Sequence, residues 1–228
     1  MSTLLLKFKA PLQSWGSESR FRVRHTGRLP TKSGVIGLCA SALGRSREES
    51  VEDLVTLRFG VRIDQPGTVI RDFQTARAEG DKNATIINRY FLQDACFVVG
   101  LEGEKQVIDE LHNALRSPER PLFLGRRSCP INTDFLLKIH DCDVEEALRL
   151  EEWHASPWYR KQQPTQLSLQ LFRDAKSGEI ADRIRDVPVS FSQEERIYSW
   201  RTVTECPSVQ VANEDGVKDD YWTTVIRL

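Results

Sequence analysis

The residues with the clearest capacity for chemistry lie between Arg20 and Gly44, where cations precede an apolar segment. From Thr31 the apolar residues recur at helical spacing as far as Gly44, a natural helix stop. The first turn of a helix presents unpaired backbone N–H groups and the positive end of the helix dipole. The stretch is therefore predicted to bind an anion. Its basic and imidazole side chains are Arg20, Arg22, Arg24, His25, Arg28 and Lys32.

Lys32 and Ser33 do not belong to a nucleotide-hydrolysing phosphate loop. That motif requires Gly, four residues and then Gly-Lys-Ser/Thr, whereas the residue before Lys32 is Thr31. The sequence also contains no GxGxxG motif. Thr31, Lys32 and Ser33 are still expected to hold a phosphate through their side chains and the free N–H groups of the turn.

Two further features offer groups to an extended anion. Arg126 and Arg127 are adjacent and precede Ser128, and a guanidinium can bind a phosphate or a base edge with parallel hydrogen bonds. The alternative is a capping loop with two solvated arginines. Trp15, in a turn with Gln13, could stack on a base or instead cover the core, and the sequence leaves both possibilities open.

Catalysis and metal binding are not expected. His25, near Arg28 and Lys32, is a candidate general base for metal-free RNA cleavage, but no tyrosine–lysine–histidine cluster accompanies it. The cluster at residues 140–143 (HDCD) lacks the CxxC or HxxxH spacing of zinc sites, so neither a metal nor another cofactor is predicted. The remaining histidines, His112, His140 and His154, are expected to be structural or solvated.

Cysteine usage and the amino-terminal residues indicate a cytoplasmic protein. The five cysteines are odd in number and form no CxxC pair, which is typical of reduced thiols. The apolar start at residues 4–6 ends at Lys7, too early for a secretory signal or a membrane span.

Charge is distributed unevenly along the chain, although the formal net charge is only -1. Residues 1–50 contain nine Lys/Arg and three Asp/Glu, a net of +6. Residues 51–140 contain twelve and thirteen, and residues 141–228 contain eleven and seventeen, a net of -6. The amino-terminal part is therefore the predicted polyanion binder.

The elements that must position these side chains follow the order β-α-β-β-α-β, that of the ferredoxin-like or RNA-recognition fold. The strand at 3–9 alternates and should bury one face. A long hairpin, about residues 67–93, is inserted before the third strand, with Arg71, Arg77, Arg89 and Tyr90 on its shoulders and a polar tip at 78–83. The predicted strands are 3–9, 57–64, 95–101 and 135–139, and the helices start at Thr31 and cover 106–115.

Residues 141–228 are predicted to form a smaller β-rich domain behind an RNA-binding domain of residues 1–140. A short helix at 144–150 is followed by a hairpin of 167–173 with 179–185 and a last strand near 197–203. The acidic balance makes this region a poor RNA platform, so we expect it to pack against the first domain or a protein partner.

Five sequence blocks, in order over about residues 1–140, resemble the CasD family, the subunit of type I-E CRISPR Cascade that holds the 5′ handle of the guide RNA. The C-terminal third matches this family only loosely. The blocks are PLQSWG (11–16), TGRLPTKSG (26–34), RDFQT (71–75), YFLQDA (90–95) and LGRRSCP (124–130).

The resemblance implies an α+β protein of the RAMP superfamily, with a ferredoxin-like domain and a thumb hairpin. It would bind and cap the crRNA handle and contact the neighbouring backbone subunit and the large subunit. It would meet target DNA only indirectly and no membrane. The candidate RNA-binding residues are Gln13, Trp15, Arg24, His25, Thr26, Arg28, Thr31, Lys32, Ser33, Arg71, Arg77, Arg126, Arg127 and Ser128.

Two other hypotheses stay open at this point. Some RAMP relatives cleave repeat RNA without a metal, so an endoribonuclease that uses His25 is the first alternative. The second is a protein-only scaffold whose basic loop is merely solvated.

Overall fold

The computed structural model describes residues 1–16, 23–77, 84–192 and 194–217. Arg20, Arg22 and the predicted polar tip at 78–83 lie outside these residues. Within the described ranges, no helix is both long and apolar enough to cross a membrane.

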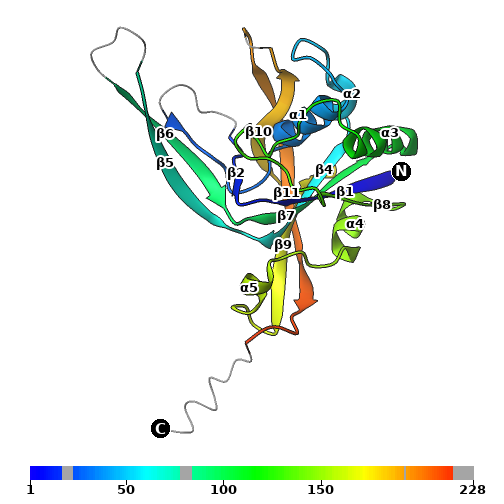
Figure 1. The fold of residues 1–228 in the computed structure, drawn as a ribbon. Coiled ribbons are helices and arrows are strands. Elements are labelled where there is room, and N and C mark those ends of the chain that lie inside the picture. The colour runs from blue at the N-terminus through cyan, green and yellow to red at the C-terminus, as the bar shows by residue number, and fades with distance from the viewer. Residues whose placement is uncertain (17–22, 78–83, 193, 218–228) are drawn as a thin grey trace.

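A seven-stranded sheet, in the order β10-β11-β9-β4-β7-β1-β8, forms the body of the molecule (Figure 1). Its strands β1 (Ser2–Lys9), β4 (Arg58–Gln65), β7 (Cys96–Gly103) and β8 (Leu136–His140) lie at the predicted positions. β7 is antiparallel to both β1 and β4, and β1 is antiparallel to β8. The helices α1 (Lys32–Ala42) and α3 (Lys105–Arg116) also agree with the predicted helices.

Helices bury both faces of this sheet, which corrects the prediction of one buried face for β1. Leu4 and Leu6 belong to the core beneath α1 and α3, whereas Leu5, also 0% exposed, belongs to a second core with Val144 and Leu148. These last two residues lie on α4 (Val144–Leu150). A strand that is covered on both faces is apolar without alternation, as Leu4-Leu5-Leu6 shows.

Two paired glycines allow α4 to lie close to the sheet. Gly60 of β4 is opposite Gly100 of β7. A Cβ at Gly60 would lie 2.8 Å from Leu148 Cδ1, and one at Gly100 would lie 2.6 Å from Val144 Cγ2. Both separations are shorter than a carbon–carbon contact allows, so glycine is required at this contact.

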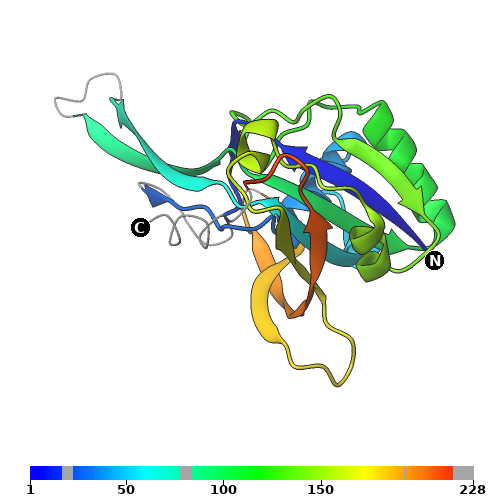
Figure 2. The ribbon, with the colours of Figure 1, turned by 90° about the horizontal axis from the view of Figure 1, so that it is seen from below.

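A long hairpin leaves the body of the molecule, as Figures 1 and 2 show. It consists of β5 (Thr68–Ala76) and β6 (Thr85–Gln93), paired from Thr68↔Gln93 to Ala76↔Thr85. On its other side β6 pairs with β2 (Leu12–Gln13) and, in parallel, with β3 (Val23–Arg24). The basic segment before α1 is thereby attached to the hairpin.

The C-terminal strands extend the main sheet. The long strand β11 (Ile197–Ala212) pairs with β10 (Asp182–Ser190) through its first half and with β9 (Gln166–Asp174) through its second, and β9 also pairs with β4. The predicted hairpin between the strands now seen as β9 and β10 is therefore wrong, because both pair with β11. The domain boundary at residue 140 stays a prediction, although the two parts share one sheet. The short helices α2 (Glu52–Val55) and α5 (Pro157–Arg160) complete the fold.

Candidate nucleic-acid interface

The N-terminus of α1 holds an anion, but that anion is the carboxylate of Asp186. Thr31 caps the helix by accepting from the Gly34 N–H at 3.2 Å. The Lys32 backbone N–H donates to Asp186 Oδ2 at 2.8 Å, and Arg201 binds both oxygens of the same carboxylate at 2.6 and 3.0 Å. The dipole and free N–H groups of the first turn are thus satisfied within the chain.

Asp174 completes this internal cluster. Its two oxygens accept from Lys32 Nζ at 3.1 Å and from Arg201 Nη1 at 2.7 Å. Burial disfavours the charged guanidinium, but the hydrogen bonds and charges of the two carboxylates raise the pKa of Arg201 above its ordinary value. Lys32 and Ser33 are each only 5% exposed. Protein carboxylates therefore already occupy the groups of Lys32 that were expected to hold a phosphate, and RNA contact by Thr31, Lys32 and Ser33 stays a prediction.

Gln13 and Trp15 are also internal. Gln13 is 0% exposed and donates to the carbonyls of Phe8 at 3.0 Å and Ala95 at 2.8 Å. Its side-chain oxygen accepts from the Trp15 indole N–H at 3.0 Å. The Trp15 ring is 2% exposed and stacks on Phe8 with centroids 5.5 Å apart. A buried ring offers no face to a base, so the structure favours the alternative in which Trp15 covers the core.

Arg126 connects three segments at the base of the hairpin. Its guanidinium donates to the carbonyls of Tyr90 at 3.1 Å, Arg24 at 3.0 Å and His25 at 3.3 Å, and it lies 4.8 Å from the centre of the Phe91 ring. Burial, and then the positive charges of Arg24 and Arg89, lower the pKa of Arg126. Arg126 therefore links β6, the segment before α1 and the 122–130 loop. It does so with the N–H groups that were predicted to bind a phosphate.

The exposed positive groups surround this central arginine. Arg24 and Arg89 are adjacent in the parallel pairing of β3 with β6, and His25 stacks on Tyr90 at 5.1 Å. Arg89 Nε is buried without a hydrogen-bond partner among the described residues. Arg127 and Ser128 are exposed on the 122–130 loop, as is Arg28 on the segment before α1. Arg24, Arg89 and Arg126 thus lie together where three segments meet, and with the neighbouring Arg28 and Arg127 we call them the arginine surface (Arg24, Arg28, Arg89, Arg126 and Arg127).

The arginines of this surface have no carboxylate partners, unlike several cations elsewhere in the molecule. In the part of the chain that the structure describes, none of the five forms an ion pair with a carboxylate. By contrast, Lys7, Arg45 and Arg173 are each paired with one. Cations that lack carboxylate partners keep a positive charge that can attract an external anion.

The remaining predicted residues lie around the same surface. Thr26 is half-buried, and its hydroxyl accepts from the Trp15 backbone N–H at 2.8 Å and donates to the Gly27 carbonyl at 2.9 Å. Arg71 and Arg77 are exposed on and just beyond β5, farther out on the hairpin. The structure therefore brings Arg24, His25 and Arg126 together, whereas Lys32 and Ser33 are buried at the start of α1.

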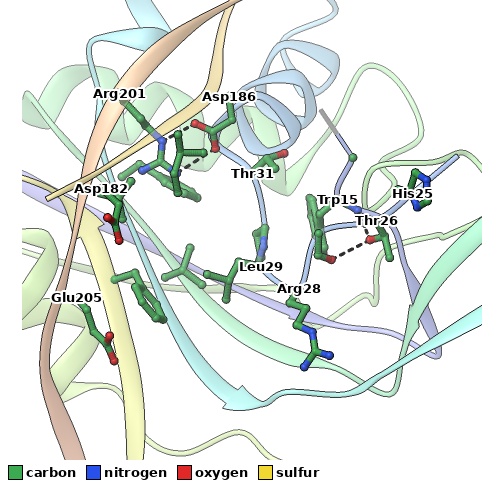
Figure 3. A pocket seen from close by; sticks show the side chains of 18 residues that line it. Trp15, His25, Thr26, Arg28, Leu29, Thr31, Asp182, Asp186, Arg201 and Glu205 are labelled. Carbon is green, nitrogen blue, oxygen red and sulfur yellow. Dashed lines mark hydrogen bonds and ion pairs between the residues drawn. The ribbon is translucent and has the colours of Figure 1, made fainter. Parts of the chain in front are cut away.

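A cavity of about 800 Å³ lies beside the arginine surface, between the segment before α1 and the C-terminal strands (Figure 3). Phe59, Phe172 and Val203 form apolar parts of its wall. Asp182 and Glu205 line one side, and His25 lies across from them beyond Trp15. The cavity thus has an apolar wall, with the carboxylates of Asp182 and Glu205 on one side.

Comparisons with known proteins assign the chain to a family. The family model described as CRISPR-associated protein (Cas_Cas5) matches residues 3–204. The chain belongs to this Cas_Cas5 family. The match extends well beyond residue 140, so the family pattern includes most of the C-terminal strands that the sequence blocks did not cover.

Relatives of this family member include proteins of CRISPR complexes. The chain is 36% identical over 169 residues to the CRISPR system Cascade subunit CasD of Escherichia coli (strain K12), covering 64% of this chain and 75% of that protein. A solved CRISPR RNA-guided surveillance complex contains a chain with a TM-score of 0.77 and 26% identity, covering 99% of this chain and 98% of that one. A crystal structure of a Cas protein has a TM-score of 0.63 and 36% identity, covering 95% and 98%.

Arg89 is the residue that sequence reasoning left out of the candidate site. It was noted only as a shoulder of the hairpin. Its place beside Arg24 depends on the parallel pairing of β3 with β6, which joins residues more than sixty positions apart. The RFRVR pattern at 20–24 alternates over five residues, as a strand does, but it does not indicate which strand is the partner.

Proposed function

We propose that this chain binds the 5′ handle of a guide crRNA as a non-catalytic subunit of a Cascade-type complex in the cytoplasm. The observation that carries the proposal is the arginine surface, where cations from three segments meet without carboxylate partners. The similarity to a chain of a CRISPR RNA-guided surveillance complex supports guide RNA as the ligand, and so does membership of the Cas_Cas5 family.

The fold supports this assignment in its finer details. The strands β4-β7-β1-β8 with α1 and α3 have the connectivity β-α-β-β-α-β, which we interpret as a ferredoxin-like unit. The hairpin of β5 and β6 is inserted between the second and third of these strands, and we interpret it as the thumb. The arginine surface lies where the thumb meets the unit.

The binding mode follows from the chemistry of the surface. Arg24, Arg89 and Arg127 would contact phosphates, because guanidinium groups form parallel hydrogen bonds with phosphate oxygens. The stacked pair of His25 and Tyr90 offers aromatic edges and faces to unstacked bases. Binding would thus depend on backbone charge and base stacking, while guide pairing reads the target DNA.

Protein neighbours would contact the outer part of the thumb. Phe73 and Ile86 are 65% and 57% exposed. Apolar side chains exposed on a protruding hairpin are typical of surfaces that a partner covers. We assign this contact to an adjacent backbone or large subunit of the complex, and we expect the arginine surface to remain with the RNA.

The test measures binding of a handle RNA to the full chain as a function of salt. Arg24→Ala and Arg127→Ala should each weaken binding and reduce the slope of log K against log salt by about one, since each removes one phosphate contact. Lys138→Ala, an exposed lysine on β8, is the matched control and should leave both unchanged. Equal slopes for all proteins would refute the proposed RNA grip.

A cleavage assay separates the proposal from the endoribonuclease hypothesis. Repeat RNA incubated with the wild-type chain should stay intact, and His25→Ala should make no difference to it. Specific cutting that His25→Ala abolishes would instead establish the nuclease.

A further inference from the structure

Two histidines from separate segments meet one buried carboxylate on a part of the molecule that the RNA proposal does not use. His140 ends β8, and His154 follows α4 in the connection to α5. The Glu151 side chain, 4% exposed, lies between them. Its Oε1 is 2.9 Å from His154 Nε2, and its Oε2 is 3.7 Å from His140 Nε2.

The His140 nitrogen lacks the partner that its burial requires. His140 Nε2 is buried and forms no hydrogen bond within the described residues. The 3.7 Å separation from Glu151 is too long for a hydrogen bond. It is close to the roughly 3.3–3.6 Å between two ligands of one tetrahedral ion whose bonds measure about 2.0–2.2 Å. A shared ion would therefore satisfy both atoms.

A fourth ligand is at hand. Ligand atoms of Glu151, Glu152 and His154 all lie within 4.8 Å of one another. Glu152 is exposed, so its carboxylate can turn toward the group without losing an internal bond. His140 lies outside that group and meets it through Glu151 Oε2, so the two imidazoles and two carboxylates supply four tetrahedral positions once the side chains close around an ion.

Buried polar contacts fix the backbone that carries these ligands. Arg62, 0% exposed, donates at 2.6 Å to the carbonyls of Glu151 and of Glu152. Asp64 pairs with Arg62 and accepts from the His154 backbone N–H at 2.6 Å. The backbone of Glu151, Glu152 and His154 is thus held by the fold before any ion arrives, which favours a specific site.

We propose that His140, Glu151, Glu152 and His154 form a binding site for a divalent transition metal, with Zn²⁺ as the ion that fits best. Imidazole nitrogen and carboxylate oxygen are ordinary zinc ligands, whereas Mg²⁺ and Ca²⁺ select sites built from oxygen alone. The ion joins the end of β8 to the connection between α4 and α5. Its role is structural, because it links segments of one chain at a site away from the arginine surface.

Zinc titration of the full chain, purified without a histidine tag and treated with a chelator, tests this site. Calorimetry should show one Zn²⁺ bound per chain, and Zn²⁺ should raise the melting midpoint because it binds the folded state. His140→Gln and His154→Gln keep polar side chains of similar size but remove a ligand, and each should weaken binding more than about tenfold. His112→Ala, on α3, is the matched control and should bind zinc as the wild type does.

Circular dichroism of the zinc-free variants confirms that they are folded before the titration. Wild-type protein that binds no zinc would overturn the proposal, as would glutamine variants that bind it equally well. If His112→Ala weakened zinc binding as much as the glutamine variants do, the proposal would also be overturned, because zinc binding would then be spread over surface histidines. Handle-RNA affinity is measured in parallel and should not change with zinc, so the two proposals can fail separately.

Discussion

Two neighbouring arginines of one sequence motif have different environments. Arg126 donates to three backbone carbonyls and lies over Phe91, whereas the side chain of Arg127 is exposed. The sequence RRS predicts a basic pair, but it does not indicate which member faces inward. Gly125, the residue before the pair, has a φ of +84° and lies against the Ser14 carbonyl, so this position allows no side chain.

Alanine variants of the pair should separate stability from RNA binding. Arg126→Ala should lower the free energy of unfolding by about 2 kcal/mol, because charge-assisted hydrogen bonds to three carbonyls are lost at a partly buried site. Arg127→Ala should change that free energy by less than about 0.5 kcal/mol. Urea unfolding followed by circular dichroism measures both. Equal stability of the two variants would contradict the role given to Arg126.

Lys32 shows how a correct local pattern can predict the wrong partner. The helix, its Thr31 cap and the anion at its N-terminus are all present. The anion comes from Asp186, 154 positions away, and local spacing carries no information about so distant a residue. The burial of Gln13 and Trp15 was not predictable from local spacing either, because it depends on tertiary contacts. Gln13 donates to the Ala95 carbonyl, and Trp15 stacks on Phe8.

Lys32→Ala should therefore act on stability. Removing the Lys32 ammonium from a buried ion pair leaves the carboxylate of Asp174 less compensated, and a loss of about 3 kcal/mol in the free energy of unfolding is expected. The salt slope of handle-RNA binding should stay at the wild-type value, because no phosphate contact is removed. A slope lower by one, with unchanged stability, would restore the phosphate role.

At the scale of elements, the hairpin of β5 and β6, which we interpret as a thumb, has an inner part that is packed and an outer part that is exposed. Phe91 and Leu92 of β6 are buried, whereas Phe73, Thr75 and Ile86 are exposed farther out. The hairpin was predictable from its apolar flanks and polar tip. The parallel attachment of β3 was not, because that contact brings together strands far apart in the chain.

Shortening the thumb tests this division. Replacing residues 73–88 by Asn-Gly joins the paired residues Asp72 and Arg89 by a two-residue turn. The melting midpoint should fall little, since the buried residues of β6 remain. Assembly with neighbouring subunits should weaken because Phe73 and Ile86 are removed. Intact assembly, measured by co-purification of the complex, would show that the outer thumb is not the subunit contact.

For the C-terminal strands, the sequence predicts that the strands exist but not how they pair. The helix at Val144–Leu150 and the presence of three strands were predictable from local patterns. The pairing was not, because β11 is long enough to accept β10 along one half and β9 along the other. Strand length and register depend on tertiary contacts that a turn signal does not encode.

For the whole molecule, part of the charge asymmetry of the sequence is satisfied internally. Asp174 and Asp186, from the acidic C-terminal part, bind Lys32 at the start of α1. The arginine surface keeps its positive charge because no carboxylate of the described residues pairs with it. The net +6 of residues 1–50 therefore overstates the free positive charge, and the surface adds Arg89, Arg126 and Arg127 from later segments.

Photo-crosslinking of a guide RNA in the assembled complex tests the central claim most directly. Crosslinked peptides, identified by mass spectrometry from a photoreactive 5′ handle, should come from residues 23–28, 84–93 and 122–130 of this chain. Arg24→Ala together with Arg127→Ala should reduce their yield. Handle crosslinks that instead map to α2, α3 or β8, or that leave this chain unlabelled, would contradict the account.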